Sequence, residues 1–252
     1  MMSEENELFK KRALELSHKS YLGGYYLFSD FLGLSELSAL RSIQGRLDSP
    51  YTLFGGVEGA ERVIAAFGNE EDIGYAPHFP IVCIAVRPKS ERFAERLTHR
   101  DYLGALLNLG IERDVLGDIV VRGYEAYIFA EEKIAPFITE SLLRVRHTDV
   151  TLSLCENIPE GALYTTEKTT IQISSERLDA IVARVFHLSR EDALTYFRRK
   201  CVFVDGALCE NNTYTPRVNQ TVSVRGLGRF IWHGFLSNTK KGKENCAVEI
   251  YK

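Results

Sequence analysis

The stretch SERLDAIVARVFHLSREDALTYFRRKCVFVDG, Ser175–Gly206, predicts two short helices followed by a β-hairpin. Its first half has apolar residues at the helical spacing i, i+3, i+4, i+7 and i+8, namely Leu178, Ile181, Val182, Val185 and Phe186. Ser189 can cap a second helix, because Asp192 stands at the capping-box position. Apolar residues then alternate up to Asp205-Gly206, a dipeptide typical of hairpin turns. We therefore expect two amphipathic helices packed on a small β-sheet.

The polar faces of these helices are rich in arginine. Arg190 and Arg198 are eight residues apart, so they lie within about 80° of each other around a helix. Guanidinium groups match phosphate oxygens bidentately, and such a surface can bind a polyanion. The basic candidates here and in the following strands are Arg177, Arg184, Arg190, Arg198, Arg199, Lys200, Arg225 and Arg229. The alternative is that each arginine pairs with a local acid such as Asp179, Glu191 or Asp192.

The charge of the chain is unevenly distributed. Residues 171–252 contain 13 Lys and Arg against 8 Asp and Glu, whereas the first 170 residues contain 18 against 26. A basic C-terminal module on an acidic body indicates that one end of the protein meets a polyanion, although chance variation between surfaces is the alternative.

The composition is that of a soluble globular protein of two or three domains, with 252 residues, of which 45% are hydrophobic and 26% charged. No apolar run approaches the roughly 20 residues that span a bilayer, and the N-terminus lacks the apolar stretch of a signal peptide. We expect a cytoplasmic protein that does not bind a membrane. The five cysteines have no CxxC spacing and the six histidines form no ligand pairs, so we expect free thiols, no metal and no small-molecule cofactor.

The pattern predicts an α+β protein of three domains. Residues 1–79 read as mostly helical, including a short helix over Ala60–Ile64. Residues 80–160 follow the order β-α-β-β-α-β, which is that of a ferredoxin-like sheet with helices on one face. Residues 169–252 hold the two helices and the small sheet of the opening stretch.

Several short motifs in the third domain resemble the S4 RNA-binding domain. They are Arg177-Leu178-Asp179, Ser189-Arg190, Val202–Asp205 and Val224-Arg225-Gly226. The resemblance implies that Arg177 and Arg190 contact a structured RNA backbone, with Ser189 and the other basic candidates around them. The chain departs from the S4 pattern at Lys200, where glycine is usual, and at Asn219-Gln220, where Gly-Asp is usual.

Two further stretches resemble the YlmH-type S4-domain proteins of bacteria. They are TLFGGVEGAER (Thr52–Arg62) and LTHRDYLGALLNLGIERDVLGDIVV (Leu97–Val121). This resemblance implies an N-terminal region, a ferredoxin-like (RRM-like) middle domain and a C-terminal S4 domain. It also implies binding to rRNA of the large ribosomal subunit, with tRNA nearby, in the rescue or quality control of stalled nascent chains. The family has also been linked to cell division.

Three alternatives concern other residues. Arg122–Phe129 is close to the RRM motif, and Tyr127 and Phe129 would share one face of the sheet, which could stack on RNA bases or belong to the core. GRLD (Gly45–Asp48) would supply the nucleophile of a pseudouridine synthase, Asp48. However, those enzymes carry S4 before the catalytic domain, so we expect no enzymatic activity. The acidic N-terminal region could instead serve a protein–protein adaptor.

Overall fold

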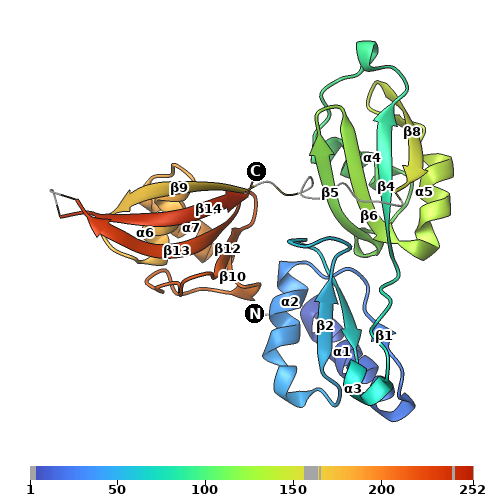
Figure 1. Ribbon diagram of the computed structural model, residues 1–252, viewed down its shortest axis with the longest axis horizontal. Coiled ribbons are helices and arrows are strands. Elements are labelled where there is room, and N and C mark those ends of the chain that lie inside the picture. The colour runs from blue at the N-terminus through green and yellow to red at the C-terminus, as the bar shows by residue number, and fades with distance from the viewer. Residues whose placement is uncertain (1–3, 156–163, 165, 240–241, 252) are drawn as a thin grey trace. The chain divides into compact units, whose positions relative to one another are not determined.

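The computed structural model describes residues 4–155, 164, 166–239 and 242–251, and its helices and antiparallel sheets confirm the α+β class (Figure 1). Contacts divide the chain into two compact units. The first consists of Met1–Glu36 with Ser42–Leu163, and the second of Leu37–Arg41 with Tyr164–Lys252. Because the first unit contains both the N-terminal and the middle segment, the three predicted domains stay a prediction.

The N-terminal part of the first unit combines helices with a small sheet. The hydroxyl of Ser20, in the first helix, donates to the carbonyl oxygen of Phe67 at 2.8 Å and ties that helix to the central strand. The sheet is antiparallel, with strand order β1-β3-β2. The elements are α1 (Glu4–Gly23), β1 (Leu27–Phe28), β2 (Tyr51–Phe54), β3 (Ile64–Phe67) and α3 (Glu70–Ile73). The helix α2 (Leu34–Ser42) belongs to both units, because its residues Leu37–Arg41 are counted with the second.

This sheet was not predicted from the sequence, which indicates a mostly helical segment for residues 1–79. The short helix expected over Ala60–Ile64 is absent from the described residues. Instead, Ile64–Phe67 forms the central strand β3, and every residue of that strand is buried. A short apolar run does not distinguish a helix from a strand buried on both faces. Here the run pairs with β1 on one side and β2 on the other, which satisfies its backbone hydrogen bonds.

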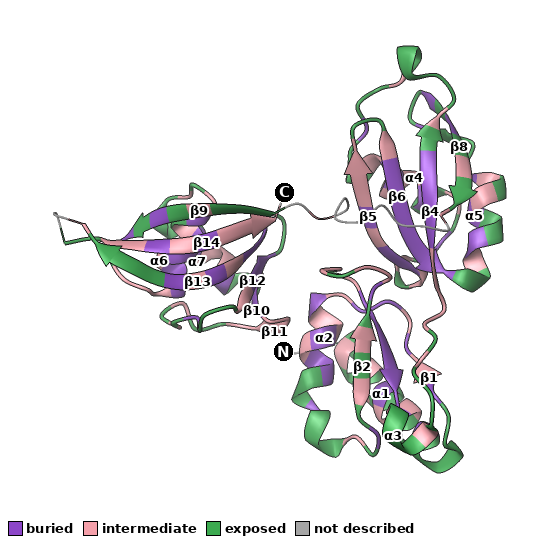
Figure 2. Cartoon of the chain, in the orientation of Figure 1, coloured by how far each residue is buried: buried purple, intermediate pink, exposed green. Residues whose placement is uncertain are grey.

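The rest of the first unit is an antiparallel sheet of strand order β5-β6-β4-β8-β7, with two helices on one face. Apart from the two-residue β7, the elements follow the predicted β-α-β-β-α-β order along the chain. They are β4 (Ile81–Pro88), α4 (His99–Asn108), β5 (Leu116–Arg122), β6 (Glu125–Glu131), α5 (Ala135–Ser141), β7 (Arg144–Val145) and β8 (Thr148–Leu154). Figure 2 shows β4 and β6 as the most buried strands of this sheet.

Capping residues set the ends of α4. The backbone N–H of Thr98 donates to the carboxylate of Asp101 at 2.8 Å, and the hydrogen bonds from Thr98 lower the pKa of that carboxyl. The helix is followed by Gly110, whose φ of 81° lies in the left-handed region that glycine tolerates best. Thr98 and Gly110 thus mark the two ends of this helix. Tyr102 and Leu106 face inward from it and pack with Ile84 and Ile128 of the sheet.

The second unit is an antiparallel sheet of strand order β11-β10-β12-β13-β14-β9, covered on one face by two helices. Trp232 and Cys246 of the sheet are fully buried against Ile181 and Phe197 of the helices. The first and last strands of the unit, β9 and β14, were not predicted from the sequence. The elements are β9 (Thr166–Ile173), α6 (Leu178–Val185), α7 (Arg190–Arg198), β10 (Val202–Val204), β11 (Ala207–Leu208), β12 (Thr221–Val224), β13 (Gly228–Asn238) and β14 (Glu244–Tyr251).

The predicted hairpin turn joins β10 and β11. Asp205 and Gly206 have φ of 48° and 76°, and positive φ at both central residues is what a type I′ turn needs.

Within the described residues, no helix is both long and apolar enough to cross a membrane.

Candidate nucleic-acid interface

Arg177, a first choice for RNA contact by resemblance, is held by a buried acid. Its Nη2 donates to Oδ2 of Asp179 at 2.6 Å and its Nε to Oδ1 at 3.1 Å. Asp179 is 1% exposed, and it also accepts hydrogen bonds from the backbone N–H of Ala180 at 2.9 Å and the amide of Asn212 at 3.2 Å. Because the arginine neutralises a buried carboxylate, the fold depends on it.

Other predicted residues are engaged on the surface of the helices. Ser189 caps α7: its hydroxyl accepts from the backbone N–H of Asp192 at 3.1 Å and donates to the carboxylate of the same residue at 2.6 Å. Arg198 forms an ion pair with Glu191, and Lys200 forms one with Glu210. The local pairing considered from the sequence is therefore found for Arg198 with Glu191, as it is for Arg177 with Asp179.

Arg225 and Arg229 lie over aromatic rings. The guanidinium of Arg225 lies 5.4 Å from the centre of the Phe203 ring and remains exposed. The Arg229 guanidinium lies 4.8 Å from the ring of Tyr164 and 4.0 Å from that of Tyr251, and the residue is only 9% exposed. Arg229 thus packs the edge of the sheet, and little of it is accessible to a ligand.

Three predicted arginines remain available. Arg184, Arg190 and Arg199 are exposed, and none of them forms an ion pair with a residue in the part of the chain that the structure describes. Arg190 is the first residue of α7, where the helix dipole disfavours a cation, so the residue gains no stability from its position. Arg199 is the C-terminal cap of the same helix.

A pocket beside α6 brings the predicted Arg184 together with His187 and Lys243, which were not among the predicted site residues. Its volume is about 500 Å³, and Arg184, His187 and Lys243 line it together with Gln172, Ser174 and apolar groups. None of its lining residues is acidic. Lys243 comes from the basic stretch Asn238–Asn245, which the sequence marks as a loop or a further basic contact; Lys240 and Lys241 in it lie outside the described residues. The proximity of His187 to Lys243 has no signal in the sequence.

The middle sheet does not offer exposed rings for stacking. Tyr127 and Phe129 share the face of β6 opposite α4 and α5, but they are only 7% and 0% exposed. Gly56, with a φ of 91°, lies so close to Phe129 that a Cβ there would be 2.5 Å from the ring. The N-terminal segment therefore covers this part of the sheet and makes Phe129 a core residue.

The two stretches that carry the YlmH resemblance contact each other. The backbone N–H groups of Glu61 and Arg62 donate to the carboxylate of Asp118 at 2.7 and 3.1 Å. The Arg62 guanidinium donates to the carbonyl oxygens of Leu116 at 2.8 Å, Phe31 at 2.9 Å and Arg113 at 3.0 Å. Burial lowers the pKa of Arg62, and burial with the nearby Arg62 charge lowers that of Arg113 to about 10. These contacts give the GGVEGAER segment a role in the fold.

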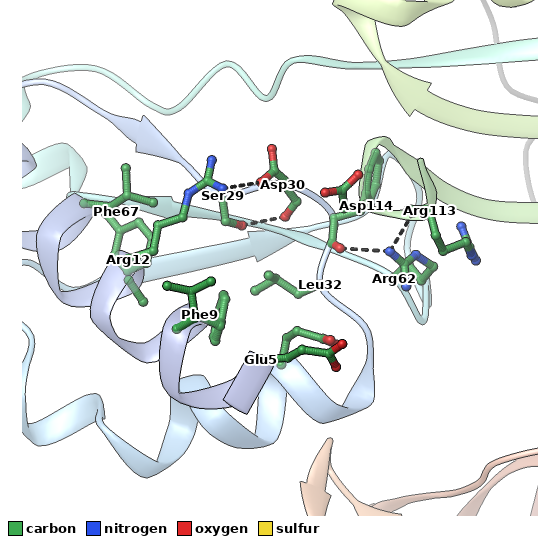
Figure 3. Close-up of a pocket in the computed structure, with 15 residues that line it drawn as sticks. Glu5, Phe9, Arg12, Ser29, Asp30, Leu32, Arg62, Phe67, Arg113 and Asp114 are labelled. Atoms are coloured by element: carbon green, nitrogen blue, oxygen red, sulfur yellow. Dashed lines mark hydrogen bonds and ion pairs between the residues drawn. The ribbon is translucent and has the colours of Figure 1, made fainter. Parts of the chain in front are cut away.

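Figure 3 shows a pocket of about 370 Å³ next to this cluster, between α1 and the loop Ser29–Leu32. Its floor is apolar, and its rim includes an ion pair between Arg12 and Asp30 at 3.1 Å. The other charged groups in its lining have both signs: Glu5, Glu36, Arg62, Arg113 and Asp114. The pocket therefore does not favour a ligand of one charge.

A third pocket, of about 640 Å³, lies between α4 and the segment after α5. Arg100, Arg144 and Arg146 line it. Two of these are paired, Arg144 with Asp149 at 2.6 Å and Arg146 with Asp101 at 3.4 Å. The hydrogen bond from Arg144 lowers the pKa of Asp149, as expected of a formed pair. Only Arg100 lacks an ion pair with the described residues, so the second unit offers the stronger cationic surface.

Asp48 lies in the loop between α2 and β2 and exposes 52% of its side chain, with Oδ2 2.9 Å from Nδ1 of His18. None of the five cysteines forms a disulfide, and burial raises the pKa of Cys83 to about 12 and that of Cys246 to about 11. Among the described residues, no group of three or more His, Cys, Asp or Glu could hold a metal ion.

Residues 77–158 match a family model described as "Putative RNA-binding domain in YlmH". A relative from Bacillus subtilis (strain 168), named "Ribosome-associated protein quality control protein P2", is 28% identical over 228 residues, which are 89% of this chain and 87% of that protein. These two matches confirm the resemblance to YlmH-type proteins that the sequence predicts. A solved structure named "Cell division protein ylmH from Streptococcus pneumoniae" has 22% identity and a TM-score of 0.48, over 62% of this chain and 93% of that one.

Proposed function

We propose that this protein binds structured RNA and catalyses no reaction on it. In this proposal residues 80–160 are a ferredoxin-like (RRM-like) domain and residues 169–252 are an S4 domain whose basic face grips the RNA backbone. The match of residues 77–158 to an RNA-binding family model and the similarity to a ribosome-associated relative support it.

The chain differs from the S4 sequence pattern at two positions, and its backbone conformation at both supports the S4 assignment. Lys200 stands where glycine is usual before the first strand, and its φ is 56°. Asn219 stands where glycine is usual before the last strand of the motif, and its φ is 68°. Both residues adopt the left-handed conformation that glycine takes at little cost. The backbone conformation at these two positions is therefore compatible with the glycines of the S4 pattern.

The observation that carries the proposal is the unpaired state of Arg184, Arg190 and Arg199 within the described residues. A surface arginine with no local acid keeps its full charge and its donors for phosphate oxygens. Arg190 is the most informative of the three, because a cation in the first turn of a helix is disfavoured by the dipole.

The partner in this proposal is rRNA of the large ribosomal subunit, with tRNA nearby, and the role is the rescue or quality control of stalled nascent chains. The name of the Bacillus subtilis relative supports this role. The ribosome is a cytoplasmic partner, which agrees with the location expected from the sequence.

The two alternatives have less support. A pseudouridine synthase would need catalytic surroundings for Asp48, whereas this carboxylate is half exposed and its one hydrogen-bond partner among the described residues is His18. An adaptor could use the N-terminal pocket, but the mixed charges of that pocket select no partner.

Crosslinking of the full chain in cells, followed by sequencing of the bound RNA, tests the proposal. The matched control is the variant Arg190→Glu/Arg199→Glu, which reverses two unpaired surface charges. We expect enrichment of large-subunit rRNA and tRNA over the control. An RNA profile equal to that of the control would overturn RNA binding through this face.

A further inference from the structure

We propose that the pocket lined by Arg184, His187 and Lys243 binds one unpaired nucleotide of the RNA, with its phosphate in the pocket and its base on the ring of Phe235. This inference rests on the proposed RNA binding and adds a specific subsite to it. The basic candidates predicted from the sequence lie on or beside the helices and the strands β12 and β13, and this subsite joins α6 to the β13–β14 hairpin (Figure 1).

The chemistry of the lining selects an anion. Arg184 and Lys243 bear positive charges, and His187 offers a ring N–H in either of its protonation states. The described residues provide no ion-pair partner for these three side chains, and no acid lines the pocket. Ser174 adds a hydroxyl that can donate to phosphate oxygens. The positive charges of Arg184 and Lys243 line the same pocket and repel each other, so an anionic ligand bound between them would relieve this repulsion.

The dimensions of the site fit a nucleotide. Small-ligand sites have volumes of about 300–1,000 Å³, and this pocket has about 500 Å³. It is open enough at the surface for a chain ligand to enter, since Arg184, His187 and Lys243 are all exposed. A base paired within a stem cannot leave its stack without losing its partner, so an unpaired nucleotide is the ligand that enters at least cost.

The sheet register brings an aromatic ring to the same face. Phe235 pairs with Cys246, and Cys246 pairs with Ile171, so these three residues form a row across β13, β14 and β9. Cys246 and Ile171 pack under α6 and α7, hence Phe235 points to the helix side of the sheet. Strands lie about 4.8 Å apart, which puts Phe235 about 10 Å from β9, the strand that lines the pocket. The ring is 47% exposed, as a stacking surface for a base must be.

Two RNA probes of equal length test this inference: a hairpin stem with one bulged adenosine, and the same stem fully paired. We expect the full chain to bind the bulged stem about tenfold more tightly, which corresponds to 1.4 kcal/mol. The variant His187→Asn/Lys243→Gln should bring the ratio of the two affinities to about one. Asparagine suits position 187 because the φ of 54° there is left-handed.

Matched variants test the phosphate-binding part and the base-stacking part of the subsite separately. Phe235→Ala should lower the ratio by about tenfold, whereas Leu236→Ala, which truncates a neighbouring exposed side chain, should keep it. Arg190→Gln/Arg199→Gln should weaken both probes and keep the ratio. Equal binding of both probes by the unaltered chain overturns the subsite and leaves RNA binding intact, whereas binding of neither probe overturns the proposed function itself. Adenosine monophosphate that binds as tightly as the bulged stem would assign the pocket to a free nucleotide and overturn the inference.

Discussion

Truncation of Arg177 should destabilise the second unit, although the S4 resemblance ranks this residue with Arg190 as an RNA contact. Arg177→Ala leaves the carboxylate of Asp179, whose side chain is 2% exposed, without its bidentate partner. Removal of one partner of a buried ion pair costs about 3–5 kcal/mol. The Arg177 side chain is 36% exposed, and Ala180 and Asn212 still donate to Asp179, so we expect a loss of about 2–3 kcal/mol.

Calorimetry of the full chain measures this loss. For a domain of 60–100 residues, 1 kcal/mol shifts the melting temperature by about 4–8 °C, so the transition of the second unit should fall by about 10–20 °C. Asp179→Asn removes the buried charge; in that background Arg177→Ala should cost only about 1 kcal/mol, the value of an ordinary hydrogen bond. The exposed pair Arg190→Ala/Arg199→Ala should change stability by no more than about 0.5 kcal/mol per site.

RNA binding provides the second readout. Each charge-assisted hydrogen bond contributes about 1.5–3 kcal/mol, so Arg190→Glu/Arg199→Glu should lower RNA affinity by at least about 100-fold with an unchanged melting temperature. Arg177→Ala, measured below its transition, should retain more of the affinity. The reasoning is refuted if Arg177→Ala melts like the unaltered chain and loses as much affinity as the Arg190 and Arg199 variant.

Binding should be electrostatic: if about five phosphates are neutralised, log affinity should fall with log salt at a slope of about −3.5 to −4.5, and an affinity independent of salt would exclude a phosphate-gripping mode. Asp48→Asn should leave the pseudouridine content of cellular RNA unchanged, because this exposed carboxylate is bonded to His18; loss of a modified site in a folded variant would support the enzyme alternative. Gly56→Ala should destabilise the first unit by about 2–4 kcal/mol, since it combines a left-handed φ with a clash against Phe129. Its matched control, Gly104→Ala in α4, meets no atom within 4 Å and should stabilise the helix by about 0.5–1 kcal/mol, so equal melting of the two glycine variants would contradict the packing described for Gly56.

The sequence by itself determined the elements whose signals are local. The periodicity of Leu178–Phe186 gives α6, the box of Ser189 with Asp192 gives the start of α7, and Asp205-Gly206 gives the hairpin turn. Each of these depends on residues within a few positions of one another, where helical or strand geometry fixes their relation. For the same reason the pairing of Arg198 with Glu191 on one helix could be considered in advance.

Only the tertiary structure decided which side of the strands is covered and which cations are free. The run Ile64–Phe67 is a strand because β1 and β2 flank it, and Phe129 is in the core because Gly56 lies against it. Arg229 is not available to a ligand because Tyr164 and Tyr251, which are distant from it in the chain, lie against its guanidinium. Lys243, just before β14, lines the same pocket as Arg184. Burial and charge pairing depend on which residues are neighbours in space. For a given side chain, a single sequence does not specify neighbours that are 20 to 90 residues away along the chain. The sheet register that brings them together is set by the packing of the whole unit.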